Sequence, residues 1–132
     1  MAVFDASVFV DALVGAGRHG DRARQELHDV AVLQVPAIFG AEATSALRGL
    51  VLRGALDPIR ASAAIEQVRI VRTIQYPFEP FCSRVWQLRA NLTIYDGWYV
   101  ALAEQLGTEL ITADRRLLKA AGPRCPIRLP AR

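Results

Sequence analysis

The sequence contains very little cysteine, histidine or lysine. Its 132 residues include two cysteines and two histidines, and fifteen of its sixteen basic residues are arginine. Cys82 and Cys125 stand at no metal-ligand spacing, so we expect no disulfide framework and interpret both as small core or loop residues. His19 and His28 lie far along the chain from its acidic motifs, and we interpret them as surface residues rather than catalytic groups.

The sequence also lacks a long apolar run. Its longest uncharged stretch, residues 30–41, contains a proline and falls well short of the roughly 20 residues that a membrane-spanning helix needs. Asp5 interrupts the N-terminus before an apolar signal-peptide region forms. With 52% hydrophobic and 22% charged residues, the composition is typical of a globular protein. We expect a single cytoplasmic domain over residues 1–132, with no membrane association.

One glycine-rich stretch, Gly15-Ala-Gly17-Arg-His-Gly20, formally matches the GxGxxG pattern of dinucleotide-binding proteins. That interpretation requires a strand ending at Gly15, which would bury Asp11 as a lone charge inside a parallel strand. We therefore interpret the glycines as a flexible loop between two helices and predict no dinucleotide site.

Short apolar runs alternate with helical patterns along the whole chain. The predicted strands lie near residues 2–4, 32–35, 70–74, 109–112 and 127–129. Between them, Asp21 is expected to cap a polar helix and Pro36 to begin a long one, and further helices are expected near residues 79–91 and 114–121. Such alternation is typical of α/β proteins. We predict a three-layer α/β/α sandwich around a mainly parallel sheet of about four to five short strands.

Four acidic residues occur where a parallel sheet presents functional groups: Asp5, Glu42, Asp96 and Asp114. Asp5 and Asp114 end two apolar runs, Glu42 lies on a helix face of small and apolar residues, and Asp96 opens a helix. Reactive groups in open α/β sheets stand at the carboxyl ends of the strands. Each acid also has an ordinary explanation, a helix cap for the three aspartates and a surface position for Glu42. Their joint placement favours one shared site.

A shared site of four carboxylates requires a cation. Two bare carboxylates about 4 Å apart repel each other by ~4 kcal/mol at an effective dielectric near 20. Oxygen ligands without paired histidine or cysteine point to Mg²⁺ or Mn²⁺, and such an ion activates water for attack on a phosphodiester. Ser7 and Thr112, each two residues from an acid, are suited to orient a carboxylate or a water. Ordinary capping and strand roles for these two hydroxyls stay open.

The net charge of +3 conceals a larger asymmetry. If the four acids share one pocket, the rest of the chain carries 16 basic and 9 acidic groups. Such a surface attracts a polyanion, and nucleic acid is the obvious candidate. Arg115 and Arg116 follow Asp114 directly and are placed to meet a substrate phosphate. The excess of arginine has an alternative explanation, a base-composition bias of the source genome. At least one of Arg115 and Arg116 can also be an ordinary surface residue.

Four motifs together resemble the PIN domain, and more narrowly the VapC toxins of bacterial VapBC toxin–antitoxin modules. The resemblance spans nearly the whole chain, and Gly97 stands where alanine is more usual. The motifs are Val3-Phe-Asp5-Ala-Ser7, Pro36 followed by Glu42, Tyr95-Asp96-Gly-Trp-Tyr99-Val-Ala-Leu-Ala103, and Leu110-Ile-Thr-Ala-Asp114-Arg-Arg-Leu117.

This resemblance implies a Mg²⁺- or Mn²⁺-dependent endoribonuclease that blocks growth by cutting tRNA or rRNA. It also implies that Asp5, Glu42, Asp96 and Asp114 form the acidic catalytic and metal site, that the chain is a homodimer, and that a VapB-like antitoxin inhibits it. The alternative is a catalytically silent PIN-like module that binds RNA or protein, against which the presence of all four acids argues. A phosphatase with Asp-x-Asp after its first strand is excluded because Ser7 stands at the second position.

Overall fold

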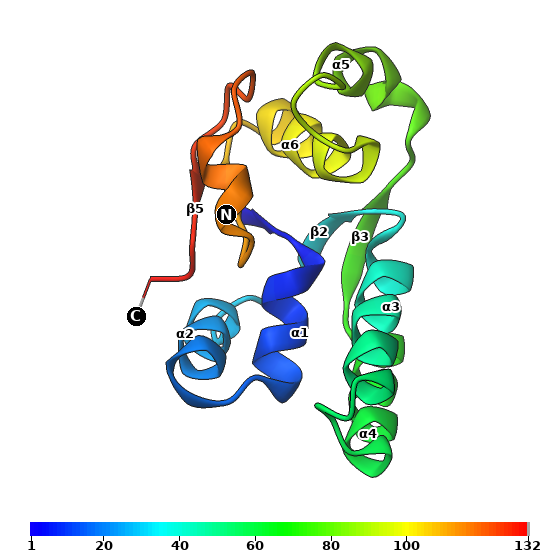
Figure 1. Ribbon diagram of the computed structural model, residues 1–132. Helices are drawn as coiled ribbons and strands as arrows, with labels where there is room; N and C mark the ends of the chain where they lie inside the picture. Colours follow the sequence, from blue (N-terminus) through cyan, green and yellow to red (C-terminus); the bar gives the residue numbers. More distant parts are fainter. Residues whose placement is uncertain (132) are drawn as a thin grey trace.

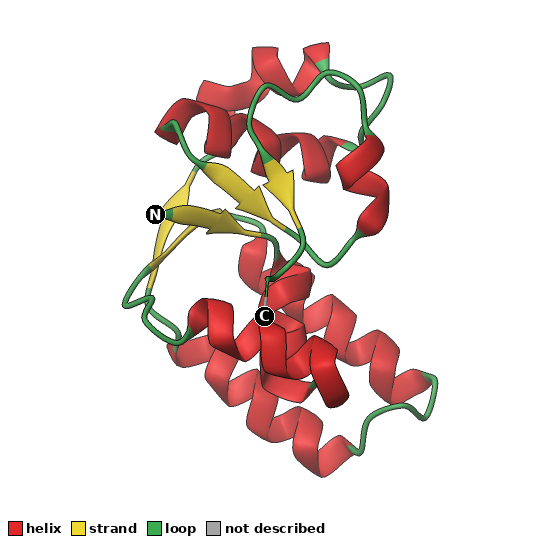
Figure 2. Cartoon of the chain, turned by 90° about the vertical axis from the view of Figure 1, so that its left-hand side faces the viewer, coloured by secondary structure: helices red, strands yellow, loops and turns green. Residues whose placement is uncertain are grey.

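The computed structural model describes residues 1–131 and places five short strands between two layers of helices (Figure 1). The strands are β1 (Ala2–Phe4), β2 (Leu33–Pro36), β3 (Thr73–Tyr76), β4 (Glu109–Ile111) and β5 (Ile127–Arg128). The helices are α1 (Ala6–Val14), α2 (Gly17–Leu27), α3 (Phe39–Leu52), α4 (Pro58–Ile70), α5 (Cys82–Gln87) and α6 (Ile94–Leu106), with the short 3-10 helices η1 (Glu79–Phe81) and η2 (Arg115–Lys119). Helices α5 and α6 cover one face of the strands and the other four α-helices cover the opposite face, so the predicted three-layer sandwich is confirmed (Figure 2).

All strand pairs are parallel. β4 lies between β1 and β5, with Phe4 of β1 opposite Ile111 of β4, while β2 pairs with β3 and also contacts β1. Because the strands run in the same direction, the residues that follow β1 and β4 emerge at the same edge. The topology thus places Asp5 beside the segment that follows β4.

The core forms where β1 and β4 meet α6. Val3 and Leu110 are fully buried, and seven consecutive residues of α6, from Gly97 to Ala103, are buried on all sides. Each large apolar side chain buried in this way stabilises the fold by roughly 1.5–3 kcal/mol. A Cβ atom at Gly97 would lie 3.3 Å from Val85 Cγ1, so α6 and α5 approach each other closely at this point.

Several predicted boundaries are wrong. Pro36 ends β2 instead of beginning a helix. The N–H of the next residue, Ala37, bonds to the Tyr76 carbonyl at 3.0 Å, so pairing with β3 continues past the proline, which has no N–H to donate. Helix α2 begins before Asp21, whose carboxylate pairs with Arg24 at 2.8 Å instead of capping. The third strand lies at residues 73–76 because α4 continues through Ile70.

The helices expected near residues 79–91 and 114–121 are also shorter than predicted. The first divides into η1 and α5, and the second is the 3-10 helix η2. Both stretches are rich in turn-forming and charged residues, so tertiary contacts and not a long apolar stripe decide their ends.

The glycine-rich stretch is not the loop that was predicted, because only Gly15 and Ala16 separate α1 from α2, which begins at Gly17. No strand ends there. Gly20 packs so closely on the end of α1 that an added Cβ would lie 2.1 Å from the Gly15 carbonyl oxygen. His19 and His28 are exposed, and both cysteines are free thiols. Within residues 1–131 no helix has the length and apolar character that crossing a membrane requires.

Candidate active site

Asp5 stands directly after β1, and two hydroxyl groups hold its carboxylate. Its backbone N–H donates to the Ile111 carbonyl at 2.9 Å, which joins the ends of β1 and β4. Thr112 Oγ1 donates to Asp5 Oδ2 at 2.7 Å, and Ser7 Oγ donates to the same oxygen at 3.0 Å. The Asp5 side chain makes no capping bond to α1. Helix capping therefore does not explain an aspartate at this position.

The two hydroxyls that hold Asp5 are themselves fixed by the segment after β4. Thr112 is fully buried, and its Oγ1 accepts the Asp114 N–H at 3.1 Å. Ser7 Oγ accepts the Ala113 N–H at 3.1 Å. Hydroxyls bonded on both sides leave the carboxylate little freedom to rotate, which is how outer hydrogen bonds orient a metal-binding group.

Glu42 and Asp96 approach Asp5 from two helices. Glu42 lies in the first turn of α3 and Asp96 in the first turn of α6, where Thr93 Oγ1 accepts the Asp96 N–H at 3.1 Å. Burial raises the pKa of both carboxyls, and the negative charge of Asp5 raises each pKa further. Asp96 also raises the pKa of Glu42. These two acids are therefore held in a place that disfavours their ionised forms.

Asp114 differs because it has a basic partner. Its Oδ1 accepts the backbone N–H of Arg116 at 2.9 Å and so caps η2, as its ordinary explanation predicts. The Arg116 guanidinium also bonds to both carboxylate oxygens, at 3.1 and 2.9 Å. These bonds hold the pKa of Asp114 below its usual range. The Arg116 side chain is 90% exposed, so the pair stands at the rim of the site and not in its floor.

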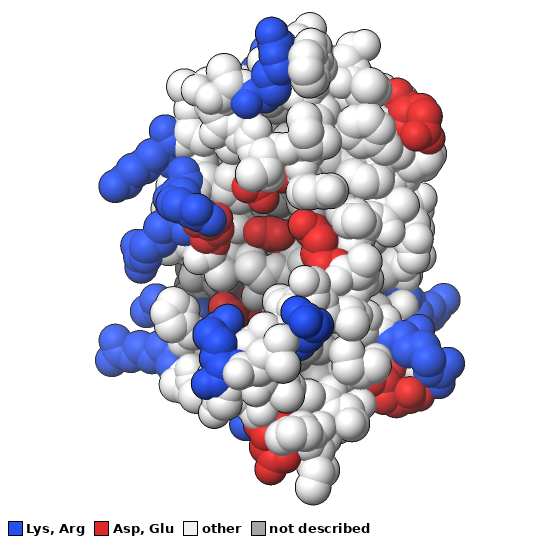
Figure 3. All heavy atoms as spheres, turned by 45° about the vertical axis from the view of Figure 1, so that its right-hand side comes forward, with Lys and Arg blue, Asp and Glu red and all other residues white. Residues whose placement is uncertain are grey.

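Asp5, Glu42, Asp96 and Asp114 (the site acids) lie at one edge of the sheet. Figure 3 shows acidic side chains around a hollow on one face, with basic side chains along its rim. Within residues 1–131, however, no three His, Cys, Asp or Glu side chains stand close enough together to hold a metal ion as placed. The predicted cluster of ligands is therefore not closed in this arrangement of side chains, and like-charged carboxylates would approach one another more closely only with a cation between them.

The donor atoms nevertheless suit a hard divalent cation. All four groups are carboxylates, and Glu42 Oε1 is buried without a hydrogen-bond partner in the described part of the chain. A buried, unpaired carboxylate oxygen is costly unless another group engages it. The chemistry of the site acids therefore fits Mg²⁺ or Mn²⁺, and rotation of their side chains is what would close the ligand set.

Arg115 and Arg116 are both exposed beside the site acids. Arg115 lines a small pocket together with Asp11, His19 and Arg22, between the first two helices and the segment after β4. Arg116 forms the pair with Asp114 described above. Both guanidinium groups are accessible to a polyanion that enters the hollow.

Tyr99 is a further residue of the site, and it lies in one of the four motifs without being one of their acids. It is 1% exposed, and its hydroxyl has no hydrogen-bond partner among the described residues although it faces the Glu42 carboxylate. Burial and the charge of Glu42 raise the pKa of Tyr99 well above its usual range. The available signal was its spacing, three residues after Asp96, which puts the two side chains on one face of α6.

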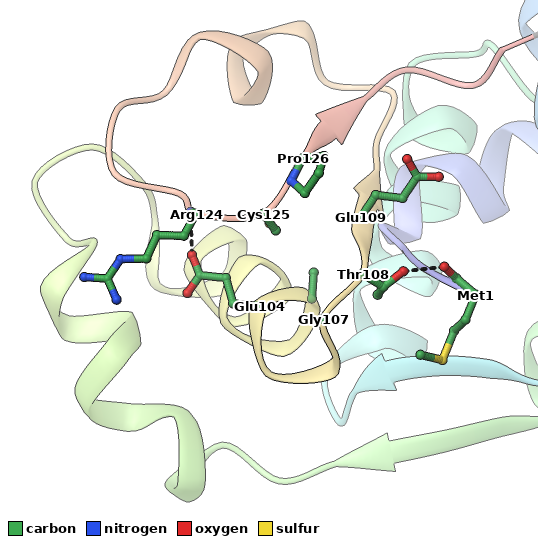
Figure 4. A pocket seen from close by; sticks show the side chains of 9 residues that line it. Met1, Glu104, Gly107, Thr108, Glu109, Arg124, Cys125 and Pro126 are labelled. Atoms are coloured by element: carbon green, nitrogen blue, oxygen red, sulfur yellow. Dashed lines mark hydrogen bonds between the residues drawn. The ribbon is translucent and has the colours of Figure 1, made fainter.

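A pocket of about 690 Å³ lies at the other end of β1 and β4 (Figure 4). Its wall includes Met1, whose carbonyl accepts a hydrogen bond from Thr108, and the carboxylates Glu104 and Glu109. Both carboxylates are engaged by arginines: Glu104 by Arg84 and Glu109 by another on β5. This pocket therefore offers no free acid for chemistry.

Comparisons with known proteins agree with this geometry. The family model described as "PIN domain" matches residues 2–123. The chain is 39% identical to the VapC ribonuclease Mb0985 of Mycobacterium bovis over 127 residues, which is 96% of each protein. It is 38% identical to ribonuclease VapC1 of Mycobacterium tuberculosis over 128 residues, again 96% of each, and 34% identical to ribonuclease VapC12 of that organism over 131 residues.

Solved structures share the fold. PAE2754 from Pyrobaculum aerophilum superposes with a TM-score of 0.67 at 25% identity, over 96% of this chain and 82% of that one. VapC20 of Mycobacterium tuberculosis, described as a sarcin–ricin loop cleaving toxin, superposes with a TM-score of 0.63 at 14% identity, over 87% of this chain and 91% of that one. At that identity the second likeness speaks for the fold alone.

Proposed function

The chain belongs to the PIN-domain family and to its VapC-type ribonucleases, and from this premise we propose that it hydrolyses RNA with a divalent cation held by the site acids. It is a toxin endoribonuclease whose substrate is RNA and whose partner is a VapB-type antitoxin. The observation that carries the metal proposal is that Glu42 and Asp96 lie half-buried among like charges and, within residues 1–131, form no ion pair with a basic side chain.

Three of the site acids would have separate roles in binding the cation. Asp5, fixed by Thr112 and Ser7, offers a carboxylate of set orientation. Glu42 and Asp96 would supply further carboxylate oxygens from two helices, and a divalent cation would offset the like charges that surround them. When bound, Mg²⁺ or Mn²⁺ supplies a Lewis acid for a phosphate oxygen and makes water a better nucleophile near neutral pH.

Arg115 and Arg116 would bind the RNA backbone at the rim. Guanidinium groups match phosphate geometry with two parallel hydrogen bonds. Such contacts position the nucleic acid without reading its sequence. An incoming phosphate would compete with Asp114 for Arg116 and so release that carboxylate toward the cation.

We further propose that the protein is a homodimer that acts in the cytoplasm. What supports a dimer is a set of exposed apolar side chains on α5 and α6, where Trp86 is 60%, Tyr95 55% and Ile94 38% exposed. Exposed aromatic residues of this kind are enriched at protein interfaces. Light scattering on the purified chain, compared with a Trp86→Ser variant, measures the oligomeric state directly.

RNA cleavage with and without metal tests the proposed function. Purified protein is incubated with a panel of structured and unstructured RNAs in Mn²⁺ or in EDTA, beside the Asp5→Ala variant. Asp29→Asn is the control, because its side chain is 96% exposed and lies outside the site. We expect cleavage in Mn²⁺ by the wild type and the control only. Cleavage that persists in EDTA would exclude the metal mechanism, and absence of cleavage by every protein would favour the binding-module alternative.

The RNA that is cut in cells is found by sequencing RNA ends after brief expression. A single set of new 5′ ends in tRNA or rRNA, absent with Asp5→Ala, would identify it. New ends spread evenly over all transcripts would contradict a specific translational target.

A further inference from the structure

The Tyr99 hydroxyl is a buried polar group that core packing does not require. The tyrosine ring fills space in the core, and the side chain is 1% exposed. Its hydroxyl makes no hydrogen bond to the described residues. A buried hydroxyl without a partner costs about 1–3 kcal/mol, which phenylalanine at the same position would avoid. The hydroxyl therefore calls for a function outside packing.

Glu42 presents the matching unpaired atom. Its Oε1 is buried and, among the described residues, likewise has no partner. The Tyr99 hydroxyl faces this carboxylate closely enough for each group to shift the pKa of the other, although no hydrogen bond is formed in the structure. A buried hydroxyl and a buried carboxylate oxygen that face each other without other partners are suited to form a hydrogen bond, with the hydroxyl as donor.

The place of Tyr99 on α6 puts its hydroxyl beneath the site. Tyr99 is three residues after Asp96, and such residues lie on the same helix face. The hydroxyl also lies by the N–H of Ala6, the residue that follows Asp5, and the charge of Asp5 acts on it. One hydroxyl is thus close to Glu42 of α3 and to the start of α1 next to Asp5, and it belongs to the helix that carries Asp96.

We propose that Tyr99 is a positioning residue, whose hydroxyl donates a hydrogen bond to the Glu42 carboxylate and fixes the orientation in which Glu42 meets the divalent cation. Rotation of the Glu42 side chain completes this bond when the carboxylates close on the ion. The role rests on the proposed function, because it acts through a metal-binding carboxylate. Tyr99 itself does not touch the reacting atoms.

The electrostatics of the pair agree with donation in this direction. A tyrosine hydroxyl carries its proton at neutral pH and can donate it in a hydrogen bond to a carboxylate. A donated hydrogen bond favours the ionised form of Glu42, against the effects of burial and of the Asp5 and Asp96 charges. The bond therefore helps Glu42 to stay ionised, which is the form that binds a cation.

Removing only the hydroxyl tests this role. Tyr99→Phe keeps the ring, and Tyr76→Phe is the matched control, because Tyr76 loses a hydroxyl that bonds to Gln34 between β2 and β3. Three quantities are measured for each: Mn²⁺ affinity by titration calorimetry, thermal unfolding in EDTA, and RNA cleavage as a function of Mn²⁺ concentration.

We expect Tyr99→Phe to bind Mn²⁺ about 10- to 100-fold more weakly, the range typical when an outer hydrogen-bond partner of a metal ligand is lost. Its melting temperature in EDTA should equal or exceed that of the wild type, because an unpaired buried hydroxyl is gone. Cleavage should recover partly at high Mn²⁺. Tyr76→Phe should bind Mn²⁺ as the wild type does.

A double-mutant comparison assigns the effect to Glu42. In a Glu42→Gln background, Tyr99→Phe should weaken Mn²⁺ binding no further, since the group it positions has been changed. The proposal is overturned if the two effects add independently, if Tyr99→Phe binds Mn²⁺ normally, or if circular dichroism finds Tyr99→Phe unfolded. If the wild type neither binds Mn²⁺ nor cleaves RNA, the proposed function fails instead, which is a distinguishable result.

Discussion

Carboxylates at the two ends of β1 and β4 have opposite surroundings. After the strands, Glu42 and Asp96 are half-buried among other acids, and burial raises the pKa of each. Before the strands, Glu104 and Glu109 line the pocket of Figure 4, and each is held by an arginine. Burial opposes ionisation of Glu104 too, but hydrogen bonds from Arg84 and from a backbone N–H outweigh it and lower the pKa.

The difference separates acids that hold the fold from acids that perform chemistry. Glu104 joins α6 to Arg84 at 2.7 Å, and Arg128 joins Glu26 of α2 to Glu109 of β4 at 3.1 and 3.0 Å. Glu26, Glu104 and Glu109 (the paired glutamates) therefore tie elements together. Within residues 1–131, Asp5, Glu42 and Asp96 form no ion pair with a basic side chain and repel one another, a loss of stability that natural proteins keep at functional sites.

The largest expected effect follows from changing Asp5. Asp5→Asn removes a charge but keeps an oxygen for Thr112 and Ser7. Loss of a ligand that is worth several kcal/mol to the transition state lowers the cleavage rate on the order of 10³-fold or more. The melting temperature in EDTA should not fall, since repulsion toward Glu42 and Asp96 is relieved. Initial rates and calorimetry measure both quantities, and a variant that loses stability and activity together would contradict this separation.

The reverse result is expected for a paired glutamate. Glu104→Gln leaves the Arg84 guanidinium without its partner, and the two side chains are only 14% and 21% exposed. The free energy of unfolding should drop by about 2 kcal/mol, less than for a fully buried pair because some solvent reaches it. Urea unfolding measures this change. Cleavage should stay within about twofold of the wild type at a temperature where both are folded, and a large loss of cleavage would place Glu104 in the site.

The pH dependence of stability should also distinguish the two groups. Because the folded pKa values of Glu42 and Asp96 are raised, the folded state holds their protons to higher pH than the unfolded state. Their destabilising effect is therefore absent below their ordinary values of about 4 and grows as pH rises through the raised values. For Glu104 and Asp114 the pKa is lowered, so their stabilising effect is lost as pH falls below about 4.

Metal-free protein should therefore become more stable as the pH falls from 7 through the raised pKa values of Glu42 and Asp96 toward their ordinary values of about 4. Thermal unfolding in EDTA across pH 3–8 measures this, with the Glu42→Gln, Asp96→Asn double variant as comparison. The double variant should melt higher at pH 7 and lack the rise on acidification. Identical pH profiles for the two proteins would show that repulsion between the site acids does not lower the stability of the folded state.

The smallest effect is expected for Arg116. Its pair with Asp114 is exposed on the arginine side, so Arg116→Ala should change the free energy of unfolding by less than about 1 kcal/mol. RNA affinity, measured in an Asp5→Asn background to prevent cleavage, should show a salt dependence reduced by about one ion. Arg60→Ala on α4 is the control and should leave the salt dependence unchanged. Equal salt slopes for both variants would remove Arg116 from the RNA contact.

The sequence could predict the three-layer sandwich because apolar runs and helical stripes alternate plainly. Asp5 and Asp114 could likewise be placed at one edge, since parallel strands end together. The position of Pro36 could not be predicted, because it depends on a hydrogen bond between Ala37 and Tyr76 across two strands. Local preference alone favoured a helix start.

The partners of the acids lay beyond the sequence for the same reason. The pair between Asp114 and Arg116 is local and accompanies the predicted cap, but the lack of an arginine beside Glu42 within residues 1–131 depends on tertiary packing, which no local pattern reports. Tyr99 has the periodicity of a core residue, and only its buried, unpartnered hydroxyl reveals a second role. Sequence patterns report which face of a helix is buried, and they do not report what the buried polar atoms meet.

Titration of metal-free protein with Mn²⁺ tests the central claim most directly. The claim is that a cation provides the site acids with a neutralising positive charge, as arginines do for the paired glutamates. We predict saturable binding by calorimetry and a melting temperature that rises with Mn²⁺ concentration, both strongly weakened in Asp5→Asn and unchanged in Glu104→Gln. No binding at millimolar Mn²⁺, or equal binding by wild type and Asp5→Asn, would contradict the account.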